Sequence, residues 1–233
     1  FFKKKKKKKN VKIKITNNYK EIFNDKDIDI VCIETPPSTH KFFAMEALKK
    51  NKGIMCEKPM GLNLKEAKLM NNKIKKNKLF ACVNYQLRFY PNIIKIKKII
   101  NKNYLGKINY VEINYHTNKI DEAKKNNWWF NKKLGGGQTN AIGSHLIDLI
   151  QYLNGKIKSL SSYQGNFLKL NKTKNITWKK NVDTYFSMAL KFSNGSLGFI
   201  NSSCITNIYN GLNIIISGEK KTLKLINFEN LFL

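Results

Sequence analysis

Three short apolar runs, separated by segments long enough for helices, constrain the fold of this 233-residue chain more than any other feature. The runs are DIVCIE at residues 29–34, IMCE at 54–57 and LFACVN at 79–84. Each is nearly continuous in apolar residues, which is typical of a parallel strand buried on both faces. The segments between them carry apolar residues at helical spacing. Strand and helix therefore alternate, which predicts a parallel sheet with right-handed crossovers.

The second half of the chain has a different pattern. A helix is expected over residues 91–106, and residues 107–117 then alternate apolar and polar, as in an antiparallel strand with one wet face. Asn194-Gly195 lies between two alternating segments and predicts a β-hairpin, and residues 211–227 predict another. This half therefore predicts a mainly antiparallel, open sheet with one prominent helix.

The predicted fold class is α/β, with a partial Rossmann-type parallel sheet followed by an α+β domain. Residues 1–10 carry a run of lysines and are expected to be disordered. The partial Rossmann domain is expected over residues 11–90, where a first strand is predicted at 11–16. The α+β domain is expected over residues 91–233.

The net charge of +29 raises the question of a nucleic-acid or membrane partner. Of the 44 basic residues, however, only Arg88 is an arginine, and sites that read bases or clamp phosphates favour arginine. Lys, Asn, Ile, Tyr and Phe share A+T-rich codons, so the base composition of the genome explains most of this charge. A nucleic-acid partner is therefore not predicted, and polyanion binding is kept only as a third hypothesis.

The four cysteines are widely spaced, with no CxxC pair and no zinc-type Cys/His spacing. They are Cys32, Cys56, Cys82 and Cys204. We expect buried free thiols, no metal site, and a reducing compartment, hence the cytoplasm. No apolar run approaches the roughly 20 residues of a membrane span, so no membrane association is predicted.

The ends of the three predicted strands carry the chemistry. In a parallel α/β sheet, ligands bind beyond the carboxyl ends of the strands. The three runs end in ETPP at residues 34–37, EKP at 57–59 and NYQLR at 84–88. All three ends are expected to meet at one rim of the sheet.

A second candidate segment is GGGQTNAIGSHLID at residues 135–148. Three glycines lead into a predicted helix, on which Ala141, His145, Asp148 and Tyr152 form one stripe beside the apolar face. A single histidine at the edge of a packed face, behind a glycine loop, can face a ligand.

Together these segments resemble the glucose–fructose oxidoreductase/inositol dehydrogenase family, also called Gfo/Idh/MocA. The resemblance rests on DIVCIETPPSTHKFFAMEALKKNKGIMCEKPMG, NYQLRFYP, LGGGQTNAIGSHLIDLIQYL and ISGEKKTLKL, in the order of the family, between residues 19 and 225. Members are NAD(P)-dependent oxidoreductases that act mostly on sugars, polyols and related compounds. The resemblance implies hydride transfer between NAD or NADP and a hydroxyl or carbonyl carbon, and a homo-oligomer formed through the sheet of residues 91–233.

The resemblance also implies roles for individual residues. Lys58 and His145 are the expected catalytic residues: the lysine contacts the reacting oxygen, and the histidine accepts the hydroxyl proton. The expected cofactor contacts are Thr35, Pro36, Pro37, Glu57, Lys58, Asn84 and Arg88. The expected substrate contacts are Lys58 and His145, together with Trp128, an aromatic residue before the glycines that is a candidate wall of the pocket.

Two departures from the family support a second hypothesis, a truncated or degenerate relative that acts as a binding or interaction protein. The family's opening strand and its Gly-x-Gly-x-x-Gly loop, which holds the cofactor pyrophosphate, are not found, and a lysine run stands in their place. Many members carry Asp four residues before the helix histidine, where this chain has Ala141. Asp148 is a weaker substitute for that partner.

Three further residues have structural explanations. His40 and His116 are expected to cap or pack rather than to catalyse. For Arg88, an ion pair with Glu57 or Glu34 explains the lone arginine as well as ligand binding does.

Overall fold

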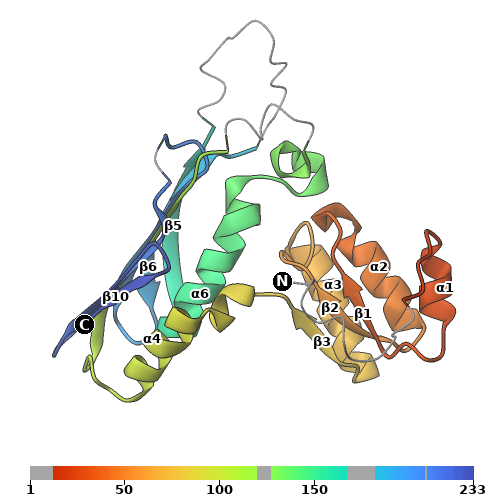
Figure 1. Cartoon of the computed structure of the whole chain (residues 1–233), viewed down its shortest axis with the longest axis horizontal. Coiled ribbons are helices and arrows are strands. Elements are labelled where there is room, and N and C mark those ends of the chain that lie inside the picture. The colour runs from red at the N-terminus through yellow and green to blue at the C-terminus, as the bar shows by residue number, and fades with distance from the viewer. Residues whose placement is uncertain (1–12, 120–126, 167–181, 208) are drawn as a thin grey trace, which may run out of the picture.

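The computed structural model describes residues 13–119, 127–166, 182–207 and 209–233. These residues form two sheets in succession, a three-stranded parallel sheet and then a seven-stranded, mostly antiparallel sheet (Figure 1). The predicted fold class is therefore confirmed, while the domain boundary near residue 90 stays a prediction. The expected lysine-rich start lies outside the described residues.

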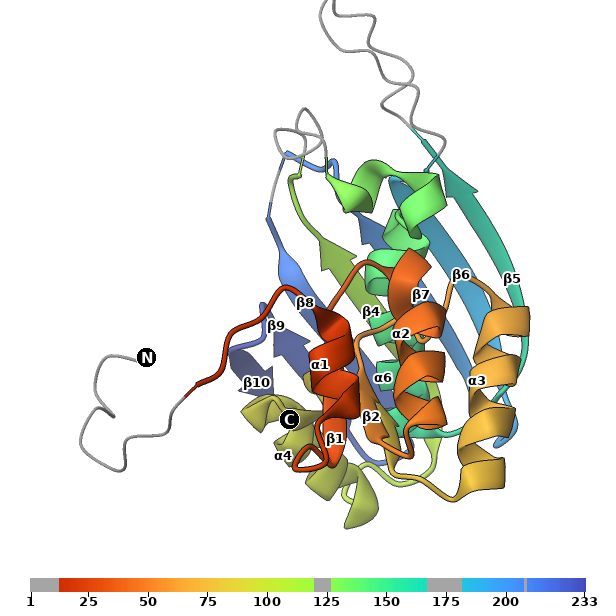
Figure 2. The ribbon, with the colours of Figure 1, turned by 90° about the vertical axis from the view of Figure 1, so that its right-hand side faces the viewer.

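The first sheet has the strand order β1-β2-β3, and each neighbouring pair is parallel. Its strands are β1 (Ile30–Ile33), β2 (Gly53–Cys56) and β3 (Ala81–Val83). The helices that accompany it are α1 (Tyr19–Asn24), α2 (Pro37–Lys49) and α3 (Leu64–Asn77). Figure 2 shows the three helices side by side in front of β1 and β2. Val31 and Ile33 pack with Ala44 and Ala47 of α2 in one buried cluster.

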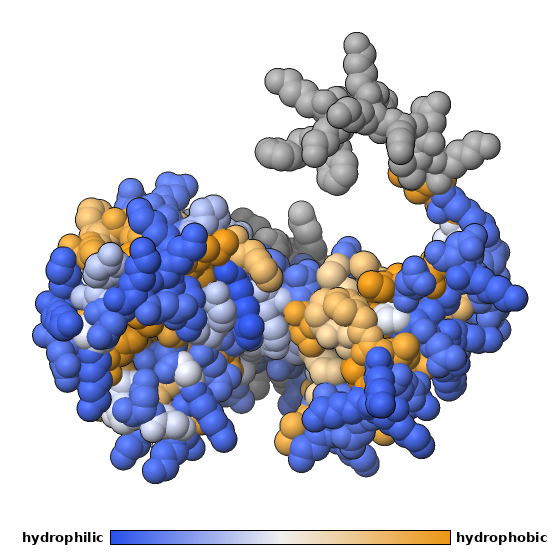
Figure 3. Space-filling view, turned by 90° about the horizontal axis from the view of Figure 1, so that it is seen from below, coloured by the Kyte–Doolittle hydropathy of each residue, from blue (hydrophilic) through white to orange (hydrophobic). Residues whose placement is uncertain are grey.

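The prediction that strand β1 is buried on both faces is wrong. Its alternate residues point away from the helices, so that Ile30 is 46% exposed and Cys32 is exposed. The helices α1–α3 lie together on one face, and the apolar run alone does not show what covers the other. In the space-filling view of Figure 3, apolar residues gather on the right-hand part of the molecule, next to the gap that separates it from the left-hand part.

The expectation that all thiols are buried is correspondingly wrong in part. Cys56 and Cys204 are buried, Cys82 is half-buried and Cys32 is exposed. All four are free thiols. Burial raises the pKa of Cys56 to about 12, so this thiol stays protonated at neutral pH.

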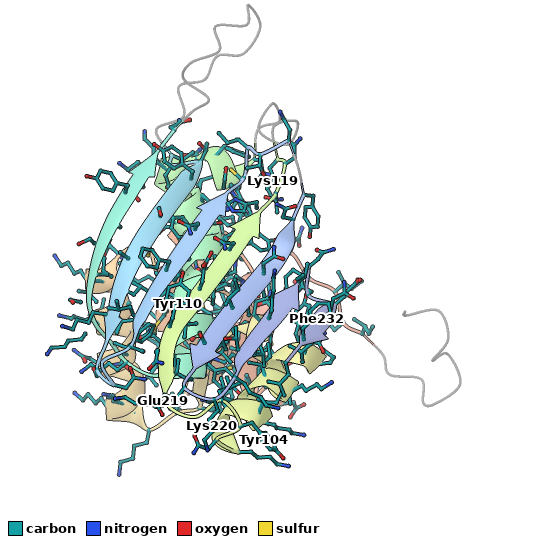
Figure 4. All side chains as sticks on the ribbon, turned by 90° about the vertical axis from the view of Figure 1, so that its left-hand side faces the viewer. Tyr104, Tyr110, Lys119, Glu219, Lys220 and Phe232 are labelled. Carbon is teal, nitrogen blue, oxygen red and sulfur yellow. The ribbon has the colours of Figure 1, made fainter. Side chains whose placement is uncertain are left out.

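The second sheet has the strand order β10-β9-β8-β4-β7-β6-β5. Its strands are β4 (Ile108–His116), β5 (Ile157–Gly165), β6 (Tyr185–Phe192), β7 (Leu197–Ser203), β8 (Gly211–Gly218), β9 (Thr222–Ile226) and β10 (Asn230–Phe232). Two helices, α4 (Pro91–Asn101) and α6 (Ser144–Asn154), lie on one face, and Figure 4 shows the opposite face without a helix. β4 pairs antiparallel with β8 but parallel with β7, so its predicted antiparallel pairing holds on one edge only.

Both predicted hairpins are confirmed. Gly195 has φ 91°, which glycine adopts without a steric cost, and it lies in the turn between β6 and β7. Strands β8 and β9 form the second hairpin. The strand predicted at 11–16 is wrong where the structure describes it, because residues 13–16 have no regular structure and Ile13 and Ile15 are exposed.

The largest core lies between α6 and the inner face of the second sheet. Leu146, Leu149 and Ile150 of α6 are fully buried there, in one cluster with Ile113 and Ile200 of the sheet. This apolar face fixes the rotation of α6 about its axis, and with it the direction of the polar stripe that begins at His145.

Leu149→Ala is expected to lower the free energy of unfolding by about 2–5 kcal/mol, because it leaves a cavity at a fully buried position of this core. Urea denaturation measures the change. Leu160→Ala in β5 is the matched control, since Leu160 is 52% exposed, and its effect is expected within about 0.5 kcal/mol. Equal losses in the two variants would contradict the packing of α6.

Candidate functional site

Lys58 links the two sheets. Strand β2 ends at Cys56, and the Lys58 Nζ donates a hydrogen bond of 2.7 Å to the main-chain oxygen of Ala141, at the start of the helical segment that carries His145. Burial lowers the pKa of Lys58, and the nearby Glu57 carboxylate opposes that shift. The amine of Lys58 is therefore held at the rim of the first sheet, facing the helical segment that begins at Thr139.

The structure brings the predicted strand ends together at this rim. Asn84, after β3, donates from Nδ2 to Glu57 Oε1 at 2.6 Å. The other oxygen of that carboxylate accepts the Lys58 N–H at 3.2 Å, and the Glu57 N–H donates to the Ile33 oxygen of β1 at 2.9 Å. Glu57 thus connects all three strands and orients the residue that follows it.

The glycine loop, Gly135–Gly137, approaches both the rim and its own chain closely. A Cβ at Gly135 would lie 2.7 Å from the Cβ of Pro37, and a Cβ at Gly136 would collide with the main-chain oxygens of Trp128 and Trp129. Gly135 and Gly137 also have φ of 87° and 115°. These contacts explain why three consecutive glycines occur at this position.

Asp183 fixes the start of the helix that follows the glycine loop. Its Oδ2 accepts hydrogen bonds from Thr139 N at 2.6 Å and Thr139 Oγ1 at 2.7 Å. A π-helical turn, Thr139–Gly143, then leads into α6. Such turns are frequent at functional sites. Sequence reasoning missed Asp183, because no pattern connects it to a helix that starts 44 residues earlier.

His145 is 5% exposed, and its ring lies 6.0 Å from that of Tyr85 in an edge-on arrangement. Burial, and then the charge of Lys58, lower the pKa of His145 from 6.5 to about 3. Its Nδ1 has no hydrogen-bond partner in the described part of the chain. The site therefore holds a neutral imidazole whose Nδ1 is buried and unpaired.

Arg88 is paired with Asp148, which corrects two expectations. The Nε of Arg88 donates to Asp148 Oδ2 at 2.7 Å and its Nη2 donates to Oδ1, while the guanidinium lies 5.0 Å from the centre of the Tyr152 ring. The hydrogen bonds to Asp148 raise the pKa of Arg88. The proposed partners Glu57 and Glu34 are therefore wrong, and Asp148 does not orient His145.

A cavity of about 530 Å³ lies beside this pair, along β3. Its polar lining comes from Asn84, Tyr85, Arg88 and Asp148, with Met55 and Phe89 as apolar walls. Apolar walls with a few polar groups are typical of a small-molecule site.

Trp128 lies in the 3₁₀ turn Trp128–Phe130, half-buried, with its ring 5.9 Å from that of Trp129. Its expected contact with a substrate stays a prediction. Among the residues that the structure describes, no three of His, Cys, Asp or Glu gather as a metal site. Within the same residues, no helix is long and apolar enough to cross a membrane.

Comparison with known proteins finds family matches over most of the chain. Residues 93–224 match the GFO/IDH/MocA C-terminal domain, and residues 3–85 match the oxidoreductase family with an NAD-binding Rossmann fold. These matches confirm the family predicted from the sequence and, at the level of that family, its nicotinamide cofactor.

Individual relatives extend the comparison. Glucose-6-phosphate 3-dehydrogenase of Bacillus subtilis is 28% identical over 198 residues, which are 82% of this chain and 55% of that protein. Glucose-fructose oxidoreductase domain-containing protein 1 of Xenopus tropicalis is 30% identical over 141 residues, which are 60% of this chain and 36% of that protein. The chain thus spans about a third to a half of these relatives.

Among solved structures, levoglucosan dehydrogenase in complex with NADH and levoglucosan superposes with a TM-score of 0.85 at 24% sequence identity. The match covers 93% of this chain and 59% of that one. This likeness concerns the fold.

The neutral, buried His145 makes the folded protein sensitive to acid. The unfolded chain takes up a proton on this ring below about pH 6.5, and the folded chain only near pH 3. The free energy of unfolding therefore falls as the pH drops below 6.5, by roughly 1–2 kcal/mol by about pH 5. His145→Asn is expected to remove this part of the pH dependence, as measured by urea unfolding at several pH values.

His116→Asn is the comparison variant. Burial also lowers the pKa of His116, but the Lys58 charge does not contribute there, so a smaller change in slope is expected. An unchanged slope in His145→Asn would show that this ring is exposed or charged in the folded protein.

Proposed function

We propose that this chain, which belongs to the GFO/IDH/MocA oxidoreductase family, forms the reaction centre of an NAD(P)-dependent oxidoreductase. The proposed reaction interconverts a hydroxyl and a carbonyl group on a sugar, polyol or related compound. The hydrogen bond from Lys58 to Ala141 carries the proposal, because it places an ammonium group next to the helix of His145.

Lys58 is proposed to bind the reacting oxygen. Its ammonium has three donors and uses one on Ala141 O, so the others are available to a substrate. When a hydroxyl is oxidised, negative charge develops on its oxygen, and a pre-positioned cation stabilises that charge most strongly where water is excluded. The half-buried position of Lys58 meets this condition.

His145 is proposed to accept the hydroxyl proton on a ring nitrogen. Its lowered pKa keeps the ring neutral at physiological pH, so an acceptor is always available. The same low pKa makes the ring a weak base, and a general base acts best with a pKa near the operating pH, so the acceptor role requires a bound substrate to raise the pKa of His145.

NAD or NADP, when bound, supplies the hydride chemistry. The residues proposed to hold its nicotinamide end are Thr35, Pro36, Pro37, Glu57, Lys58, Asn84 and Arg88. Two of them are already oriented, Asn84 by Glu57 and Arg88 by Asp148. The sequence contains no Gly-x-Gly-x-x-Gly motif to hold the pyrophosphate.

A sugar-like substrate is supported by relatives that are named as dehydrogenases of glucose 6-phosphate and levoglucosan. Trp128 is proposed as one wall of its pocket, with Lys58 and His145 at the reacting carbon. We also propose a reducing compartment such as the cytoplasm, because all four cysteines are free.

Lys58→Ala is expected to lower kcat by about 10²- to 10³-fold, since it removes the cation at the developing charge. Turnover is measured with NAD and NADP on a panel of sugars and polyols, and cofactor binding by quenching of tryptophan fluorescence. Lys68→Ala is the matched control, because Lys68 is an exposed lysine of α3 outside the rim, and it is expected to leave both readings unchanged.

Saturable binding of NADH or NADPH, together with turnover that depends on Lys58, would support the proposed oxidoreductase function. No binding at millimolar cofactor would contradict it for this chain, and would favour a truncated or degenerate relative that acts as a binding or interaction protein.

A homo-oligomer formed through the open face of the second sheet is also proposed (Figure 4). Tyr110 of β4 and Phe199 of β7 lie together on that face with ring centroids 6.1 Å apart, and Leu197 beside them is 52% exposed. Exposed apolar surface on a sheet is commonly covered by a partner.

Phe199→Glu is therefore expected to reduce the molar mass in solution, measured by analytical ultracentrifugation, because it places a charge in the proposed contact. Leu64→Glu on α3 is the control, since Leu64 is also an exposed apolar residue, at 69%. A wild-type chain that sediments as a monomer at all concentrations would contradict the proposal.

A further inference from the structure

His40 is fully buried in the first turn of α2, and both of its ring nitrogens face main-chain oxygens. Nδ1 lies 2.9 Å from the oxygen of Pro59, and Nε2 lies 2.7 Å from the oxygen of Thr35. A carbonyl oxygen only accepts hydrogen bonds and a neutral imidazole has one N–H, so the ring donates to one of these oxygens in each tautomer and to both only when it is doubly protonated. This is more than the capping or packing role expected from the sequence.

The two oxygens belong to different turns of the rim. Thr35 follows β1, and Pro59 is the residue directly after Lys58. His40 therefore ties the turn after β1 to the turn after β2, through contacts that span 5 and 19 residues of sequence. Thr39 adds a local bond, from its Oγ1 to the Thr35 hydroxyl at 2.7 Å.

These bonds hold the main chain on both sides of Lys58. On one side, the Lys58 N–H donates to Glu57 Oε2, and Asn84 orients that carboxylate. On the other side, the next carbonyl, that of Pro59, accepts from His40 when the proton of the ring is on Nδ1. The lysine side chain itself is a flexible stem of four carbons, so the placement of its ammonium depends on where the main chain is fixed.

We propose that His40 is a positioning residue for Lys58, which acts by holding the Pro59 carbonyl against the Thr35 turn. With the main chain fixed there, the Lys58 ammonium reaches the Ala141 oxygen and lies beside His145. The catalytic consequence rests on the proposed function, but the placement of Lys58 does not. Displacing a reacting group by about 1 Å costs on the order of 10²-fold in rate.

The first test measures the placement of Lys58 without any turnover. Competitive acetylation of the folded chain by N-hydroxysuccinimidyl acetate over a pH series, read by peptide mass spectrometry, gives the titration of the Lys58 amine. In the wild type its pKa lies below the ordinary 10.5 because of burial. In His40→Asn we expect it to move upwards towards 10.5, as the ammonium leaves its buried position.

Lys52 is the internal control. It is 5% exposed, lies just after the other end of α2, and its Nζ donates to the oxygens of Asp25 and Ile28. Its acetylation rate is expected to stay unchanged in His40→Asn. An unchanged Lys58 titration would overturn the proposal, and so would a parallel change at Lys52, which would indicate general loosening around α2. His40→Leu, which has no hydrogen-bond donor, is expected to move the Lys58 titration further than His40→Asn, whose side-chain amide can still donate.

The second test is kinetic. His40→Asn is expected to lower kcat about 10²-fold while the cofactor dissociation constant changes only a few-fold, and His116→Asn to change neither. Unchanged turnover in His40→Asn would overturn the part of the proposal that concerns catalysis. If the wild type and Lys58→Ala are equally inactive, the proposed function fails, and the Lys58 titration alone decides the role of His40.

Discussion

The burial of one ammonium group, that of Lys58, determines how the two sheets meet at the site. A buried cation is costly unless an acceptor faces it, and its acceptor is the Ala141 oxygen, 83 residues further along the chain. The close approach of the glycine loop belongs to the same arrangement, because a side chain at Gly135 would collide with Pro37 at the rim. The site is therefore a contact between the rim of the first sheet and the helical segment that packs on the second sheet.

Two pairs of side chains determine the charge around this contact, namely Arg88 with Asp148 and Lys58 with His145. Arg88 neutralises Asp148, the carboxylate nearest to His145 along α6, and leaves it unable to draw a proton onto the imidazole. Lys58 acts in the same direction, since its charge lowers the pKa of His145. The outcome is a cationic donor next to a neutral acceptor, the combination that a hydroxyl group needs if it is to lose a proton and keep its oxygen bound.

The sequence predicted the parts of the site that follow from topology. The ends of three parallel strands lie at one edge whatever the lengths of their connections, so the meeting of Glu57 and Asn84 was predictable. The partner of Arg88 was not, because it depends on the rotation of a helix 60 residues away. The exposure of Cys32 also depends on neighbouring elements and not on its own apolar run. The role of Ala141 could not be predicted from the sequence, because every residue has a main-chain carbonyl oxygen.

That last point explains why alanine at this position is compatible with the hydrogen bond of Lys58. Replacing a carboxylate by alanine at residue 141 keeps the main-chain oxygen that binds Lys58, and removes only a side-chain partner for His145. The ring is then left with an unpaired Nδ1 in a buried place, which costs about 1–3 kcal/mol. No described residue therefore fixes the tautomer of His145 through its Nδ1.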